Sequence, residues 1–246
     1  MGSAISALRL VHLYPGLMGR YGHQGNALIL AQRSRWRGVE CEIVAVAPGE
    51  PIPSQADLYL LAGGDTPGVC TLAALLQQQQ GLRSAVQRGA VLLAIGSGFQ
   101  VLGHSLRLRS GQSVDGLGLL DAHSEPARKR RYGPVLADPL LPIEAPLLGF
   151  EDHQRIIRLG AGSHALAWLR CGEGNGGGQG TEGAWQSSIV ATSLRGPVLA
   201  LNPGLADALL SRLLGPLSPL PMLAVDRLRE RFLRGLPRRC ASATRR

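Results

Sequence analysis

The sequence predicts an α/β fold in which a mostly parallel central sheet is covered by helices on both faces. Short apolar segments alternate with longer helical patterns through the first hundred residues, as in strands that are joined by crossover helices. The chain has 246 residues, and 45% of them are apolar. A chain of this length and composition can bury one large core.

The first half contains four expected strands and two expected helices. Each strand is a short apolar run that ends in small or polar residues, and the first helix stops at Gly38. The Gln77–Gln80 run inside the second helix is interpreted as an exposed turn. The strands are expected at Leu8–Leu13, Cys41–Val46, Asp57–Ala62 and Ala90–Ile95, and the helices at Asn26–Arg37 and Thr71–Arg88.

The second half is less regular. The Gly-rich stretch Gly172–Gly183 has neither the Lys-Ser/Thr pair of a phosphate-binding P-loop nor a GxGxxG pattern, so it is interpreted as a flexible surface loop. The remaining segments are interpreted as a loop that enters a strand (Asp115–Asp121), a basic loop (Arg128–Val135), a short strand (Leu148–His153), two closing strands (Ser188–Thr192 and Val198–Leu201) and a final helix (Pro203–Leu214).

A basic tail follows this region, and the chain divides into a domain over residues 1–214 and a Pro/Arg-rich tail over 215–246. Asp226–Arg246 contains eight arginines and two acidic residues, a net charge of +6. The tail is interpreted as a solvated, partly helical appendage. Docking on nucleic acid, on an anionic surface or on an acidic partner is the alternative.

The four cysteines, Cys41, Cys70, Cys171 and Cys240, are widely spaced and form no CxxC pair. They predict reduced thiols, with neither a disulfide framework nor a metal site. No apolar stretch reaches the about 20 residues of a membrane span. Because Leu8–Leu13 is already a core strand, no secretory leader is expected. We therefore expect a cytoplasmic protein.

The segment around position 96 has the pattern of a nucleophile elbow. The expected strand Ala90–Ile95 ends in Gly96-Ser97-Gly98, and an apolar helix start follows. Such a strand–turn–helix lifts one reactive side chain above the sheet and needs small flanking residues, here Ala94 and Gly98. The central position is Gly96, which has no side chain that could react.

Several segments, in order and at suitable spacing, together resemble the class I glutamine amidotransferases, in particular the GatD-like subunit of lipid II isoglutaminyl synthase. The amidotransferase domains of cobyric acid synthesis are more distantly similar. The resemblance covers roughly residues 8–214 and is carried by Leu13–Asn26 (LYPGLMGRYGHQGN), Arg35–Gly38 (RWRG), Ala62–Asp65 (AGGD), Leu93–Gly103 (LAIGSGFQVLG), Gly116–Asp121 (GLGLLD), Gly149–His153 (GFEDH) and Leu194–Leu199 (LRGPVL).

The resemblance implies a flavodoxin-like three-layer α/β/α domain and a glutaminase site. In such a site a Cys on the elbow attacks the side-chain amide of glutamine, and a His acts as acid and base. The Cys position falls on Gly96 and the His position on Arg195. A guanidinium stays protonated at ordinary pH, so Arg195 cannot be a general base.

The resemblance also assigns binding roles that survive these replacements. Backbone groups of Ser97, Gly63 and Gly64 could still form the frame that stabilises an oxyanion. The Arg that holds the substrate carboxylate falls on Arg130. Neither a cofactor nor a metal is implied, and L-glutamine is the expected small-molecule ligand.

Three residues are weighed as substitutes for the missing groups. Ser97 as nucleophile would place Ile95 and Phe99 where an elbow needs small residues. Cys70 follows the glycine loop and is interpreted as a buried structural thiol. His153, in the GFEDH segment, is assigned a structural or substrate-side role.

Similar proteins supply ammonia from glutamine to a Mur-ligase-like subunit that amidates a glutamate of lipid II. Since removing a nucleophile and its base costs several orders of magnitude in rate, this chain is predicted to be a catalytically inactive scaffold or regulatory homologue of such a glutaminase subunit. One alternative is an active subunit with a displaced nucleophile. Another is a basic protein that binds nucleic acid or an anionic surface through its tail.

Overall fold

The central sheet of the computed structural model is built mainly from parallel strands. Within residues 7–18, 20–63, 66–237 and 240, which the structure describes, it has six strands in the order β11–β12–β4–β3–β1–β2, and only β11 is antiparallel to its neighbour. The strands are β1 (Ala7–Leu13), β2 (Glu40–Val46), β3 (Leu58–Leu61), β4 (Val91–Ile95), β11 (Ala184–Gln186) and β12 (Ile189–Thr192). The mostly parallel sheet predicted from the sequence is confirmed.

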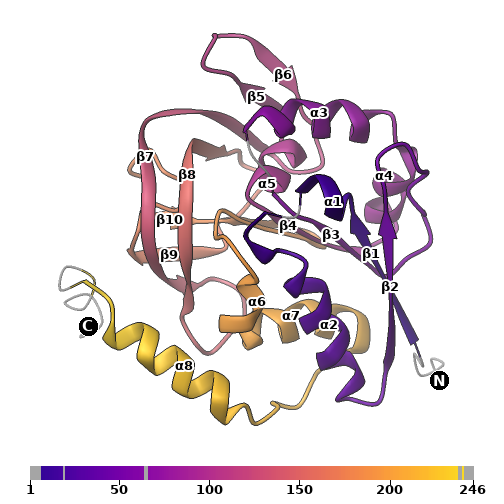
Figure 1. Cartoon of the computed structure of the whole chain (residues 1–246), viewed down its shortest axis with the longest axis vertical. Helices are drawn as coiled ribbons and strands as arrows, with labels where there is room; N and C mark the ends of the chain where they lie inside the picture. Colours follow the sequence, from indigo (N-terminus) through magenta and orange to yellow (C-terminus); the bar gives the residue numbers. More distant parts are fainter. Residues whose placement is uncertain (1–6, 19, 64–65, 238–239, 241–246) are drawn as a thin grey trace.

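Helices cover both faces of this sheet, because side chains alternate along each strand. In β4, Leu93 and Ile95 pack in one apolar core with α2 (Gly25–Arg35), α6 (Val198–Leu201) and α7 (Pro203–Leu214). Leu92 and Ala94 pack in a second core with α3 (Thr66–Gln77), α4 (Gln80–Gln87) and α5 (Ser97–Leu102). Figure 1 shows the two helical layers on opposite sides of the sheet. The flavodoxin-like three-layer class is confirmed.

A second sheet lies beside the first (Figure 1) and corrects two predictions. Arg128–Val135, predicted as a basic loop, belongs to the long strand β7, and the short strand predicted at Leu148–His153 is part of the 13-residue strand β8. A register shift between Pro126 and Arg131 bends the pair at the basic cluster. The strands are β5 (Ser105–Arg107), β6 (Ser113–Asp115), β7 (Ala122–Pro139), β8 (Leu147–Leu159), β9 (Ala167–Cys171) and β10 (Thr181–Glu182).

Two further segments differ from expectation. The helix predicted over Thr71–Arg88 is divided into α3 and α4 at the Gln77–Gln80 run, so the turn interpreted there is confirmed. Val198–Leu201 forms α6 rather than a strand. A short apolar run fits a buried strand and a buried helical turn equally well, which explains the error.

The Gly-rich segment is anchored by side chains beneath it. The two carboxylate oxygens of Glu151 accept the backbone N–H groups of Glu173 and Gly174, each at 2.9 Å. Asn175 is fully buried and donates to Gly183 O at 2.8 Å. The interpretation as a surface loop is therefore wrong for the middle of this segment.

The tail contains α8 (Leu223–Arg234), which packs on the domain beside α6. The buried guanidinium of Arg229 donates to Pro146 O at 2.7 Å and also to Leu201 O. Leu236 and Cys240 join an apolar cluster with Leu136 and Leu148. The predicted helical content is present, but this part of the tail is not a fully solvated appendage.

Cys171 and Cys240 form a disulfide that closes a sequence separation of 69 residues. The prediction of four reduced thiols is wrong for this pair, while Cys41 and Cys70 are free. The bridge depends on β9 and the tail meeting in space, which cysteine spacing does not reveal. None of the described helices combines the length and the apolar character needed to cross a bilayer.

Candidate active site

The turn at Gly96 has the geometry of a nucleophile elbow. β4 ends at Ile95, Gly96 has φ 58° and ψ −112°, and α5 begins at Ser97. Most side chains would be strained in this conformation, and an elbow uses that strain to present its nucleophile. The Gly96 N–H donates to Thr192 O on β12 at 2.8 Å, so the neighbouring strand holds the turn. The turn predicted from the sequence is present.

The guanidinium of Arg195 fills the space in front of Gly96. A Cβ atom added at position 96 would lie 2.2 Å from Nη1 and 3.0 Å from Cζ of Arg195. The Arg195 Nε–H donates to Asp152 O at 3.1 Å, and Cζ lies 5.5 Å from the centroid of the Tyr21 ring. The two positions to which the resemblance assigns nucleophile and base therefore face each other, and a side chain at position 96 would require the Arg195 guanidinium to move.

The glycine loop after β3 lies directly against the elbow. A Cβ atom at Gly63 would lie 2.6 Å from both Ile95 O and Ser97 N, and 3.1 Å from Arg195 Nη1. The structure thus brings Gly63, Ser97 and Arg195 together, while Gly64 lies outside the described residues. The oxyanion-binding role of Gly63, Gly64 and Ser97 stays a prediction.

Arg130 is paired with a carboxylate of the protein itself. Its Nε–H and Nη2–H donate to Oδ1 and Oδ2 of Asp152 at 2.6 and 2.7 Å, and the Tyr21 hydroxyl donates to Oδ2 at 3.0 Å. The bonds from Arg130 hold the pKa of Asp152 below its usual range, and the Tyr21 bond acts in the same direction. Asp152 is therefore ionised at neutral pH, and a substrate carboxylate at Arg130 would have to displace it.

His23 is fully buried, and the charge of Arg195 acts on it. Its Nδ1 lies 3.1 Å from Gly196 O, an acceptor, so Nδ1 carries the proton of the neutral ring. Burial first, and then the positive charge of Arg195, lower the pKa of His23 to about 4. His23 is thus neutral at pH 7, which allows an imidazole and a guanidinium to share one buried region.

None of the three residues weighed as substitutes for the missing nucleophile and base has the surroundings of an elbow nucleophile. Ser97 is buried between Ile95 and Phe99, which are large and fully buried, so an elbow centred on Ser97 would lack small flanks. Cys70 packs against the apolar core but is only partly buried, so the interpretation as a buried thiol is wrong in its burial. His153 Nε2 lies 3.4 Å from Glu151 Oε2, and His153 and Asp152, as neighbours in β8, point to opposite faces.

Sequence reasoning missed three residues of this region: Tyr21, His23 and Asp152. All lie inside the segments that carry the resemblance, YGHQG and GFEDH. Strand alternation in GFEDH was the available signal, because it separates Asp152 from Glu151 and His153. Among the described residues, no group of three or more His, Cys, Asp or Glu side chains is arranged to hold a metal ion.

Comparison with known proteins agrees with the fold. Residues 9–203 match the model of the CobB/CobQ-like glutamine amidotransferase domain. The chain is 27% identical over 207 residues to the GatD subunit of lipid II isoglutaminyl synthase (glutamine-hydrolyzing) from Staphylococcus aureus, covering 83% of this chain and 84% of that protein. For the Streptococcus pneumoniae subunit of the same name the identity is 26%, over 83% of this chain and 79% of that protein.

Two solved structures support the fold alone. A glutamine amidotransferase from Thermotoga maritima superposes with a TM-score of 0.51 at 12% identity, covering 92% of this chain and 93% of that one. The glutaminase domain of Trypanosoma brucei CTPS has the same TM-score at 10% identity, covering 87% of this chain and 96% of that one.

The family match, together with the three-layer fold and the elbow, identifies a glutamine amidotransferase-like domain. Since the family match spans residues 9–203 of 246, the chain belongs to the CobB/CobQ-like glutamine amidotransferase domain family. The GatD subunits are relatives within this class.

Proposed function

We propose that this chain is a catalytically inactive glutamine amidotransferase homologue that acts as a scaffold or regulatory subunit beside a Mur-ligase-like partner. One observation carries the proposal: the Arg195 guanidinium fills the space that a nucleophile at position 96 would need. A guanidinium can neither take the proton of a thiol nor protonate departing ammonia at ordinary pH.

The expected loss of rate is large. In a well-studied hydrolase, loss of the nucleophile or of its base alone costs about 10⁶ in rate, and further losses add little. A remaining oxyanion frame supplies about 10³–10⁴ over water. Glutamine hydrolysis at a useful rate is therefore not expected.

The pairing with a partner rests on the relatives and on the surface next to the elbow. The S. aureus and S. pneumoniae relatives are named as subunits of a synthase, and each aligns with 83% of this chain. Tyr132 is 69% exposed, and the side chain of its neighbour Arg130 is 64% exposed. Tyr and Arg are residue types enriched in protein interfaces.

The direct test is a glutaminase assay on the purified protein, alone and with any ligase-like chain that co-purifies from the native cell. We expect no ammonia above the protein-free rate, and we expect the ligase-like chain in the pull-down. Ammonia release that disappears in Ser97→Ala or Cys70→Ala would show a displaced nucleophile and overturn the proposal. Isothermal calorimetry with L-glutamine tests separately whether the ligand still binds.

The outer face of α8 supports a second candidate function, binding of nucleic acid or another anionic surface. Arg227, Arg231 and Arg234 are exposed there, while Arg229 points inward. Fluorescence anisotropy with duplex DNA at several salt concentrations tests it, with anionic vesicles as a parallel probe. If it is right, Arg227→Gln with Arg231→Gln weakens binding and reduces its salt dependence. Unchanged binding would remove this candidate.

A further inference from the structure

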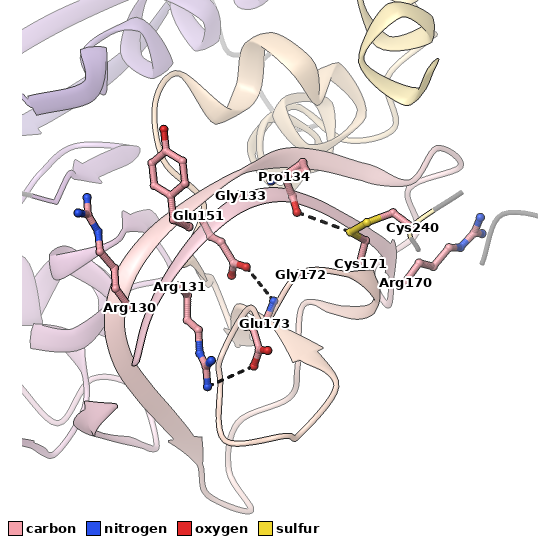
Figure 2. Close-up of a pocket in the computed structure, with 11 residues that line it drawn as sticks. Arg130, Arg131, Gly133, Pro134, Glu151, Arg170, Cys171, Gly172, Glu173 and Cys240 are labelled. Atoms are coloured by element: carbon pink, nitrogen blue, oxygen red, sulfur yellow. Dashed lines mark hydrogen bonds and ion pairs between the residues drawn. A yellow bond between two sulfur atoms is a disulfide. The ribbon is translucent and has the colours of Figure 1, made fainter. Parts of the chain in front are cut away.

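The Cys171–Cys240 bridge borders a cavity on the second sheet, apart from the elbow. The cavity has a volume of about 420 Å³ and is lined by residues of β7, β8 and β9, the segment after β9 and the tail. Figure 2 shows the sulfur–sulfur bond next to Pro134, with Arg131 and Glu173 pointing toward each other in the same cavity. Arg130 is a member of both regions, whereas neither Gly96 nor Arg195 is among the described lining residues. The cavity is large enough for a small molecule.

The two cysteines differ in exposure. Both line the cavity, and both contact the apolar cluster of Leu136, Leu148 and Leu236. Cys240 is 1% exposed, whereas Cys171 is partly exposed at the end of β9. A thiol that enters from solvent therefore has more access to Cys171 than to Cys240.

The charged groups around the cavity are paired with one another. Arg131 pairs with Glu173 at 3.5 Å, and Arg170 donates to both carboxylate oxygens of Asp138. The Glu151 oxygens accept the N–H groups of Glu173 and Gly174. Exposure therefore distinguishes the two sulfur atoms, because thiol–disulfide exchange depends on access to the sulfur that is attacked. Cys171 is the cysteine that an entering thiolate reaches.

We propose that Cys171–Cys240 is a reversible thiol–disulfide exchange site for a small soluble thiol. A thiolate RS⁻ attacks Sγ of Cys171, the Cys171–Cys240 bond breaks, and the Cys240 sulfur leaves with the electron pair and takes a proton from water. A second RS⁻ attacks the R-bearing sulfur of the mixed disulfide, which releases Cys171 as thiolate and RSSR as the oxidised product. The bridge closes by the reverse exchange with RSSR.

Opening the bridge releases only the end of the tail. The Arg229 bonds to Pro146 O and Leu201 O hold α8 in place without the disulfide. Leu236 is held by burial in the apolar cluster, and Cys240 is held by the bridge. The exchange site therefore controls the exposure of Leu236 and Cys240, while the domain and α8 remain folded.

The first experiment locates the chemistry. The full chain is purified with iodoacetamide present to block free thiols, and its bridge is identified by peptide mass spectrometry. It is then treated with glutathione as the probe, under conditions in which far-ultraviolet circular dichroism is unchanged. We expect the glutathione adduct on Cys171. Absence of the bridge, an adduct on Cys240, or reduction only on unfolding would each overturn the proposal.

The second experiment follows the tail by limited trypsin digestion at Arg234. Reduction of the wild type and the variant Cys240→Ser should each speed cleavage there by about tenfold, because local opening becomes easier. Cys41→Ser, which changes a free cysteine, is the matched control and should cleave like the oxidised wild type. If Cys240→Ser fails to fold, the comparison of oxidised with reduced wild type remains the test. Equal cleavage in oxidised and reduced wild type would contradict release of the tail.

Discussion

The elbow and the end of the tail are opposite cases of a reactive site. At the elbow the turn at Gly96 and the close approach of Gly63 are present, but Gly96 has no side chain and the guanidinium of Arg195 is not a base at ordinary pH. At the tail, two sulfur atoms are joined beside a cavity of the second sheet. The contrast teaches that a backbone frame and its reactive atoms can be present separately, so each needs its own test.

The largest effect is expected from restoring the reactive atoms to the elbow. In the double variant Gly96→Cys with Arg195→His, removal of the guanidinium makes room for the thiol, and an imidazole stands beside it. We expect glutaminase activity at least about 10³-fold above the wild type, because the nucleophile and its base act as a unit. Coupled measurement of ammonia and glutamate checks this.

The single variant Gly96→Cys is the control. The positive φ of position 96 strains any side chain there, and Arg195 cannot act as a base for the thiol, so we expect no activity and a lower melting temperature. Equal activity in the single and double variants would show that Arg195 does not block the elbow.

The next effect concerns the tail. Replacing Cys171 and Cys240 by Ala removes a bridge across 69 residues. Because the bridge lowers the chain entropy of the unfolded state, we expect the free energy of unfolding to fall by about 4 kcal/mol. Urea denaturation without reductant measures it. Reductant should lower wild-type stability to the level of the variant and leave the variant unchanged. A wild type insensitive to reductant would mean that the bridge does not stabilise the fold.

A smaller effect tests the backbone frame alone. Gly63→Ala places a methyl group 2.6 Å from Ile95 O and Ser97 N, and such overpacking costs about 1–3 kcal/mol. Gly68, in α3, has open space around its added Cβ, so Gly68→Ala should be neutral or stabilising. Chemical denaturation of both variants checks this. Equal destabilisation would show that the approach at Gly63 is not tight.

The smallest effect concerns pH. His23 has a pKa of about 4 in the folded chain and an ordinary value of 6.5, so the unfolded chain binds more protons between these values. Stability should therefore fall as pH decreases, by about 2 kcal/mol between pH 7 and pH 5 from this group. His23→Asn keeps a donor for Gly196 O and should lose this part of the pH dependence. Denaturation curves at the two pH values decide it.

The parallel half of the fold could be predicted from the sequence because its strands are continuous apolar runs. Leu8–Leu13 lies within β1, and Pro203–Leu214 matches α7. The second sheet could not be predicted, since the consecutive basic residues in Arg128–Val135 are typical of a loop, although they form part of an antiparallel strand. Val198–Leu201 was too short for its periodicity to distinguish a strand from a helix.

The candidate site was predictable where it depends on a turn and not where it depends on strands meeting. The elbow follows from small residues at fixed spacing. The residue that faces it, Arg195, occupies the position that the resemblance assigns to the base. The Arg130–Asp152 pair joins β7 to β8, and the disulfide joins β9 to the tail. Both require the register and packing of elements that the sequence did not delimit.

The geometry at Gly96 also bears on how catalysis could return by mutation. A cysteine acquired first at position 96 must displace the guanidinium of Arg195, which cannot act as its base. An imidazole acquired first at position 195 has no thiol to activate, and the positive φ at position 96 still strains the cysteine that follows. Neither replacement brings a catalytic benefit alone, so both must be present before selection for glutamine hydrolysis can act.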